Sequence, residues 1–265
     1  MWESLIIQPM TNLLLFIYDL LGSGPHMFGL AIILFTIVIK LITWPLNASQ
    51  VKGAQAMQEL QNDKDWQEIQ KKYAKDREKL AQEQMRIYKE KGINPFASCL
   101  PTLVQFPIII GLYQSIIRAL SATPLDMLKL ARTIYPFQDV QSIIPLNSTF
   151  LWMDLGRPES IQILGFALPT LAIIVAVTTW IQTKLTMPAS SNPNDQSAQM
   201  SRMMSIYMPF LLGWFALNFA SGISVYFIIS NILGVVQYAA TGRANWNNLL
   251  PGRRTPAAAS TTKKK

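Results

Sequence analysis

One apolar stretch with a single charge in it, Phe28 to Leu46, constrains this chain more than any other feature. It reads FGLAIILFTIVIKLITWPL, which is long and apolar enough to predict a membrane-spanning helix. Lys40 is its one charged residue. A lysine inside a span costs a few kcal/mol on insertion scales, so it indicates a functional site with water or a partner beside it.

Polar residues around Lys40 recur at helical spacing. Thr36, Lys40, Thr43 and Asn47 follow one another at steps of four, three and four, which places them on one face of a helix. The rest of this helix is apolar. The pattern predicts that the polar face lies against water or other polar groups.

The composition indicates a polytopic membrane protein. Half of the 265 residues are hydrophobic and 14% are charged, which is too apolar a balance for an ordinary soluble domain. A single cysteine excludes an internal disulfide, and a single histidine excludes a multi-histidine metal site. The sequence has neither an HExxH motif nor a GxxxxGKS/T phosphate loop. We therefore expect no cofactor, no metal and no enzymatic activity.

The N-terminal segment is apolar but interrupted. Polar residues and Pro9 break the run in residues 1–25, which favours an extracytoplasmic, interfacial helix followed by a turn; a spanning helix is the alternative. Residues 26–46 form the first predicted span.

Residues 47–93 have a different character. They hold ten basic and eight acidic residues, together with an apolar stripe at helical spacing. This pattern predicts a soluble helical hairpin that ends at Gly92, with Asp65 as an N-cap after the turn. The stripe includes Trp66, Ile69 and Tyr73.

Four further spans are predicted beyond the hairpin, at residues 94–120, 161–183, 203–220 and 221–242. A single helix over 203–241 would be about 58 Å long, roughly twice the thickness of a bilayer core, so we divide it near Gly222. The remaining segments are a polar connection (121–160), a short loop (184–202) and a basic tail (243–265).

Basic residues predict the orientation. The hairpin holds ten Lys and Arg residues and the tail six, whereas the 121–160 connection holds three. With five spans, the positive-inside rule places the hairpin, the 184–202 loop and the tail in the cytoplasm, and the N-terminus outside. The predicted fold is an all-α polytopic membrane protein with five transmembrane helices, a cytoplasmic amphipathic helical hairpin and an N-terminal interfacial helix.

An ordered set of motifs carries a family resemblance. Residues 93–108 read INPFASCLPTLVQFPI and residues 150–155 read FLWMDL. Further matching residues are Pro209, Phe210, Gly222, Tyr226, Ser230, Asn231 and Gln237. Over about residues 28 to 240, the chain closely resembles the YidC-type membrane protein insertase family, in a compact form without a large external domain.

The resemblance implies a five-helix core, a cytoplasmic hairpin, and a polar groove open to the cytoplasm and to lipid but closed outside. The groove charge in relatives is usually arginine, and the matching residue here is Lys40. Arginine stays charged, whereas a buried lysine is able to lose its proton. A second departure is Tyr226-Phe227, where the family has a Tyr-Trp pair.

Polar stripes on three predicted spans are candidates for lining this groove. The groove and client-binding candidates are Lys40, Thr36, Thr43, Thr102, Gln105, Tyr226, Ser230 and Gln237. Hydrogen bonding between helices is the alternative role for Gln105, Ser230 and Asn231. No acidic residue lies within the five predicted spans to pair with Lys40.

The function expected from these features is that of an insertase or chaperone for membrane proteins. A hydrated groove shortens the apolar distance that a client's polar segment must cross, and Lys40 attracts an acidic segment. Burial of the client's apolar segment in lipid supplies the driving force without nucleotide hydrolysis. A secondary transporter or channel that uses Lys40 as a substrate or ion site is the alternative, although no inverted repeat favours it.

Partners and location complete the expectation. We expect nascent membrane proteins and the lipid bilayer as partners, with the ribosome and a Sec-type translocon as further candidates. The hairpin residues Trp66, Ile69 and Tyr73 are predicted to receive clients. Ribosome or lipid contacts are predicted for Arg253, Arg254, Lys263, Lys264 and Lys265, with a solubilising tail or a positive-inside anchor as the alternative. We expect a bacterial plasma membrane, because no transit peptide precedes the core.

Overall fold

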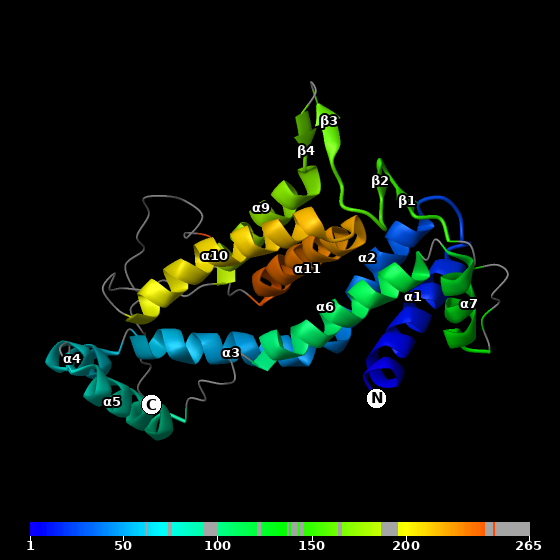
Figure 1. The fold of residues 1–265 in the computed structure, drawn as a ribbon. Coiled ribbons are helices and arrows are strands. Elements are labelled where there is room, and N and C mark those ends of the chain that lie inside the picture. The colour runs from blue at the N-terminus through cyan, green and yellow to red at the C-terminus, as the bar shows by residue number, and fades with distance from the viewer. Residues whose placement is uncertain are drawn as a thin grey trace.

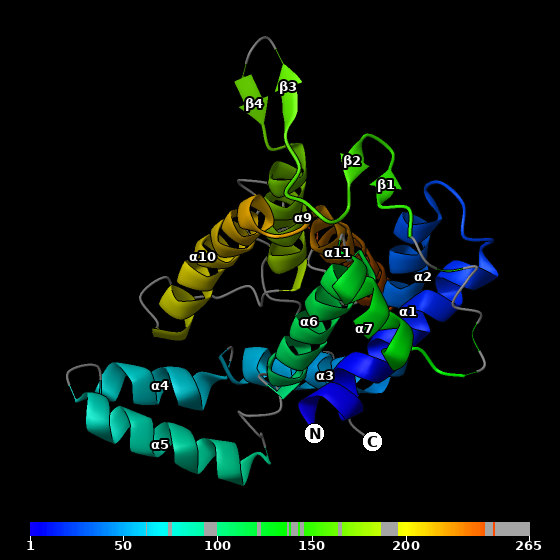
Figure 2. The same cartoon turned by 45° about the vertical axis from the view of Figure 1, so that its right-hand side comes forward.

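The computed structural model is largely helical (Figures 1 and 2). It describes residues 1–61, 63–73, 76–92, 100–120, 123–136, 138, 143, 146–163, 166–186, 196–241 and 246. A π-helical segment (Glu3–Ile7) precedes helices α1 (Gln8–Leu20), α2 (Met27–Ile42), α3 (Trp44–Gln61), α4 (Lys64–Lys72), α5 (Arg77–Glu90), α6 (Leu100–Ala119), α7 (Pro124–Thr133), α9 (Thr170–Thr186), α10 (Gln196–Asn218) and α11 (Ser221–Ala240). Two antiparallel hairpins join β1 (Thr149–Phe150) to β2 (Met153–Asp154) and β3 (Ile161–Ile163) to β4 (Phe166–Leu168).

Helix α11 lies at the centre of the bundle. It packs against α9 and α2 and also touches α6 and α10, while α10 packs mainly on α9. Small residues let these helices approach closely: Gly213 of α10 faces Ala176, and Gly234 of α11 faces Gln182. Most of α11 is buried as a result.

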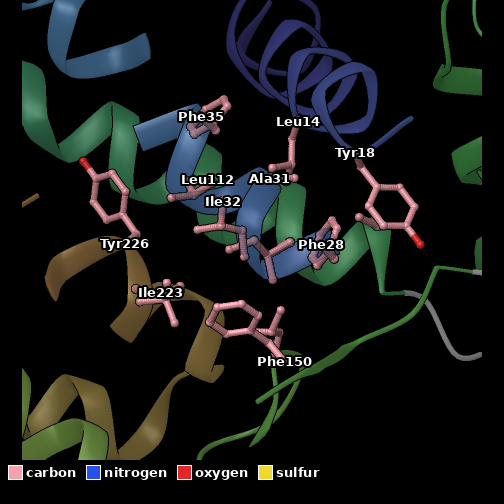
Figure 3. Packing of buried hydrophobic residues seen from close by; sticks show 14 of the residues in the cluster. Leu14, Tyr18, Phe28, Ala31, Ile32, Phe35, Leu112, Phe150, Ile223 and Tyr226 are labelled. Atoms are coloured by element: carbon pink, nitrogen blue, oxygen red, sulfur yellow. The ribbon is translucent and has the colours of Figure 1, made fainter. Parts of the chain in front are cut away.

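The largest apolar cluster forms where α1, α2, α6 and α11 meet (Figure 3). Fully buried members are Leu14, Phe28, Ile32, Phe35, Leu112 and Ile116. Phe150, from the β1–β2 hairpin, covers the cluster beside Phe28. The cluster therefore joins segments that are far apart in the sequence.

Helix α1 runs across α2 and α6 (Figure 1) and turns its polar side chains toward the protein. Thr11 Oγ1 donates to Ser115 Oγ at 3.0 Å, and Asn12 Nδ2 donates to the Thr133 carbonyl at 3.0 Å. Its exposed side chains Phe16 and Leu20 are apolar, as are Trp2 and Leu5 in the segment before it. The polar residues that interrupt this segment in the sequence are thus hydrogen-bonded within the fold.

Helices α4 and α5 form a pair that shares a small core with the end of α3. Trp66, Leu60, Ile87 and Tyr88 are buried together, and Ile69 and Leu80 pack against them. The N-cap of α4 is Asp63, whose side chain accepts from the backbone N–H of Asp65 at 2.9 Å. The expectation of Asp65 as N-cap was therefore wrong by two residues, because the turn ends earlier than its composition indicated.

The segment from residue 161 differs from the expected helix. Residues 161–163 and 166–168 form the paired strands β3 and β4, and α9 begins only at Thr170, directly after Pro169. Glu159 fixes this start, since its carboxylate accepts from Thr170 Oγ1 at 2.7 Å and from the Leu171 N–H at 3.1 Å. A carboxylate at a helix N-terminus is favourable because it satisfies free N–H groups and the helix dipole. Helix α10 also begins earlier than predicted, at Gln196.

Large apolar side chains are exposed on the helices of the bundle. Examples are Phe106 on α6, Val177 on α9, Phe210 on α10 and Val236 on α11. Among the described residues, α11 alone combines the length and the apolar composition of a complete membrane span, while α2 and α9 are apolar but shorter. These exposed side chains would be unusual on a soluble protein and suit contact with lipid.

Candidate functional site

Lys40 lies in the last turn of α2, where the buried face of that helix ends. Ile32, Thr36 and Lys40 follow at steps of four; Ile32 and Thr36 are 0% exposed, whereas Lys40 is partly exposed. Within the part of the chain that the structure describes, no carboxylate forms an ion pair with Lys40. The charge thus lies at the boundary of the packed core without a permanent counter-charge among those residues.

The two threonines near Lys40 are bonded within their own helix. Thr36 Oγ1 donates to the Ile32 carbonyl at 2.6 Å, and Thr43 Oγ1 donates to the Ile39 carbonyl at 2.9 Å. Thr36 is fully buried, so its side chain does not face water on a groove wall as expected. A buried threonine satisfies its hydroxyl on the preceding turn, and helical spacing does not reveal this. Thr43 is partly exposed and keeps its candidate role.

Gln105 of α6 and Tyr226 of α11 meet between the helices. Gln105 Nε2 donates to Tyr226 Oη. Ser230 is buried one turn further along α11. Tyr226 is 1% exposed and lies at the edge of the apolar cluster, with its hydroxyl directed away from Ile223 (Figure 3). Two of the predicted groove residues, Gln105 and Tyr226, are therefore joined across α6 and α11.

The remaining polar residues of α11 have other surroundings. Asn231 Nδ2 donates to Thr178 Oγ1 at 3.1 Å and to Thr179 Oγ1 at 2.9 Å, which joins α11 to α9. Asn231 therefore acts as an interhelical hydrogen-bonding residue. Gln237 is buried near the end of α11. Sequence reasoning missed the two threonines of α9, although their adjacency to each other in an apolar helix was a visible signal.

Apolar groups close the bundle on the side of α11's first turn. A Cβ added to Gly222 would lie 3.2 Å from Ile32 Cδ1, from Ile116 Cδ1 and from the Leu155 carbonyl oxygen. Three segments thus converge on one glycine with no room to spare. Ile32 of α2 lies in this tight apolar contact, whereas Lys40, two turns further along the same helix, is partly exposed.

The hairpin residues are placed mainly in its interior. Trp66 is 4% exposed and Ile69 packs against the hairpin core, while Tyr73 is partly exposed, with Lys72 Nζ 5.3 Å from its ring centroid. The prediction that these residues receive clients stays a prediction. The side chain of Thr102 lies outside the described residues, as do the tail residues Arg253, Arg254, Lys263, Lys264 and Lys265.

Comparisons with known proteins identify the family. The family model described as 60Kd inner membrane protein matches residues 18–247. The chain is 33% identical over 240 residues to membrane protein insertase YidC 2 of Bacillus anthracis, covering 89% of this chain and 79% of that protein. It is 32% identical over 240 residues to membrane protein insertase MisCA of Bacillus subtilis, covering 89% and 77%.

A solved structure shares the fold. It is a crystal structure of an active YidC insertase with its first transmembrane domain resolved, with a TM-score of 0.53 and 24% sequence identity. The match covers 91% of this chain and 46% of the crystallised one, so the present chain corresponds to less than half of that protein. This likeness shows the fold. The family model and the sequence matches show that the chain belongs to the 60Kd inner membrane protein family, the family of the YidC-type membrane protein insertases.

Proposed function

We propose that this protein is a membrane protein insertase, which moves transmembrane segments of nascent clients into the bilayer through a polar groove open to the cytoplasm and to lipid. The family membership and the names of its relatives support this function. The single structural observation that carries the mechanism is Lys40, a partly exposed charge at the end of a buried helix face.

The proposed topology has five spans, formed by α2, α6, α9, α10 and α11. Helices of 16 to 23 residues rise about 24 to 35 Å, which is close to the thickness of a bilayer core. Each also exposes large apolar side chains. In this topology α3, α4 and α5 lie in the cytoplasm as the helical hairpin, and α1, α7 and the β hairpins lie outside, with α1 at the interface.

The path for a client follows the change in polarity along α2. A polar or acidic segment is attracted to Lys40, because a charge near low-dielectric surroundings acts strongly at short range. Beyond Lys40, the Gln105–Tyr226 pair offers neutral hydrogen-bonding groups, and the contacts around Gly222 close the outer end. The polar segment therefore has only a shortened apolar distance left to cross.

Burial of the client's own apolar segment in lipid supplies the driving force in this proposal. About 20 apolar residues leaving water release far more free energy than one short polar segment costs to transfer. The mechanism therefore uses no nucleotide of its own.

The cytoplasmic segments complete the proposed pathway. The α4–α5 part of the hairpin receives clients, with Tyr73 as the partly exposed contact residue. The basic tail contacts the ribosome or anionic lipid. A Sec-type translocon is a further proposed partner. The proposed location is a bacterial plasma membrane, with the N-terminus outside and the C-terminus in the cytoplasm.

Charge variants of Lys40 test the mechanism in proteoliposomes. We expect Lys40→Ala to reduce insertion of a client with an acidic translocated tail, Lys40→Glu to reduce it further, and Lys40→Arg to preserve it. The matched control is Lys52→Glu on α3, which reverses an exposed charge outside the proposed groove. If Lys40→Glu inserts the acidic client as fast as wild type, Lys40 does not attract clients by charge.

A further inference from the structure

Helix α6 is held firmly over its C-terminal half. A Cβ added to Gly111 would overlap the Met10 side chain of α1, at 2.5 Å from its sulfur atom. Ile116, one and a half turns further on, is 0% exposed and touches the site of Gly222 on α11. This half of α6 is therefore packed on two sides.

The N-terminal part of α6 is attached differently. Among the side chains that the structure describes there, the polar contact that joins it to α11 is the hydrogen bond from Gln105 to Tyr226. Its neighbour Phe106 is 57% exposed, so the face of α6 that carries Phe106 is not covered by the described residues. Helix α3 also contacts α6, but it follows α2 in the chain and does not join α6 to α11.

Pro107 lies between the two parts of the helix. Proline has no N–H to donate to the carbonyl four residues earlier, and its ring crowds that carbonyl, so a helix bends most easily there. The segment before Pro107 is able to move while the packed half stays in place. The Gln105–Tyr226 hydrogen bond opposes this movement.

We propose that the Gln105–Tyr226 hydrogen bond is a latch between α6 and α11, and that a client segment releases it by hydrogen-bonding to the amide and the phenol. The inference rests on the proposed insertase function, and it names the ligand chemistry of the site. That ligand is the peptide backbone of an extended client segment. Such a segment carries unpaired N–H and C=O groups, which are costly in a low-dielectric setting.

The two groups suit this ligand because both are neutral and each is able to donate and to accept. They bind a peptide group whatever the side chain beside it, whereas Lys40 selects for acidic segments. The site therefore accounts for clients whose translocated segments carry no charge. Breaking one interhelical hydrogen bond raises the population in which α6 and α11 are separated by roughly three- to fivefold. The free energy that this requires is small enough for client binding to supply.

Distance measurements without any client test the latch itself. Spin labels replace the exposed residues Phe106 and Val236 in a Cys99→Ser background, which removes the chain's single cysteine. We expect Tyr226→Phe and Gln105→Leu each to raise the population with separated labels by about three- to fivefold, with no further rise in the double variant. An unchanged distance distribution in both single variants overturns the latch.

Tyr113→Phe is the matched control, because it removes a phenol hydroxyl from the packed half of α6 while leaving the ring that meets Phe219 edge-on at 5.2 Å. It should leave the label distances unchanged. A comparable separation in this variant would show that any lost hydroxyl loosens the bundle, and would also overturn the latch.

Insertion of a client with an uncharged polar tail tests the ligand. We expect Tyr226→Phe and Gln105→Leu to slow it by about threefold or more, since each removes one of the two binding groups. Separated labels with wild-type insertion would overturn client binding at this pair. A failure of the Lys40 experiment leaves the distance result untouched, so the two proposals fail separately.

Discussion

Phe150 lies directly on the backbone of Gly29. A Cβ atom at Gly29 would be 2.1 Å from Phe150 Cδ2, well inside van der Waals contact. Gly29 is in the first turn of α2, and Phe150 ends strand β1, so this contact holds the β1–β2 hairpin against the bundle. Because Gly29 has no side chain, Phe150 and the β1–β2 hairpin are able to pack against α2.

Gly29→Ala is expected to destabilise the protein by about 1 to 3 kcal/mol, because the methyl group forces the Phe150 ring out of its place. Thermal unfolding in detergent measures the effect. Gly24→Ala is the control, since the nearest atom to its Cβ is 3.7 Å away. The contact is of no consequence if both alanine variants unfold at the wild-type temperature. Phe150→Leu should partly restore stability in the Gly29→Ala background.

Asn231→Leu removes both hydrogen bonds between α11 and the threonine pair of α9. We expect a loss of about 1 kcal/mol, because hydrogen bonds between membrane helices contribute about 0.6 kcal/mol on average and about 1.7 kcal/mol at most. Unfolding of the purified protein in mixed micelles gives the value. Ile232→Ala, on the exposed side of the same turn, should change it little. Equal losses in the two variants would argue against a specific polar contact.

Asp63 links the start of α4 to the end of α5. Its side chain bonds Lys91, and this bond, with the N-cap contact to the Asp65 N–H, holds the pKa of the Asp63 carboxyl below its usual value. The carboxylate therefore stabilises the hairpin above its ordinary pKa of about 3.9, and the contribution is lost as the pH falls through the lower folded value.

Asp63→Asn should accordingly weaken the hairpin at pH 7 and make no difference in strong acid. Hydrogen exchange of peptides from α4 and α5, corrected for the intrinsic pH dependence, follows the change. Asp65→Asn is the comparison, because the Asp65 side chain is exposed beside the cap. If the hydrogen-exchange rates of wild type and Asp63→Asn differ by the same factor at every pH, the ionisation of Asp63 does not stabilise the hairpin.

Trp66→Ala is expected to cost the hairpin about 3 to 5 kcal/mol, since Trp66 fills the centre of its core. Limited proteolysis between α4 and α5 detects the opening. Met85→Ala, at an exposed position of α5, should leave the cleavage rate unchanged. A client-binding defect of Trp66→Ala thus reports the fold of the hairpin, and Tyr73→Ala is the cleaner test of contact. Wild-type proteolysis of Trp66→Ala would contradict the packing.

The sequence determined the family, the helical class and the position of the one charged residue in the first apolar helix. Apolar run length and charge content depend only on local composition, so they are readable without a structure. The same holds for the hairpin's stripe, which predicted that Trp66 and Ile69 share a face. Motif order then identified the family through residues such as Gln105 and Tyr226.

Only the tertiary structure decided which partner each polar residue has. Helical spacing placed Thr36 beside Lys40, yet Thr36 is buried and its hydroxyl donates to a carbonyl of its own helix. Gln105 hydrogen-bonds a tyrosine that is 121 residues away in the sequence. Spacing fixes the face of a helix, whereas burial depends on the neighbours that cover that face. For the same reason residues 161–163 and 166–168 pair as strands. Their apolar composition suits either structure, and α9 begins only after Pro169, where Glu159 accepts from its first N–H groups.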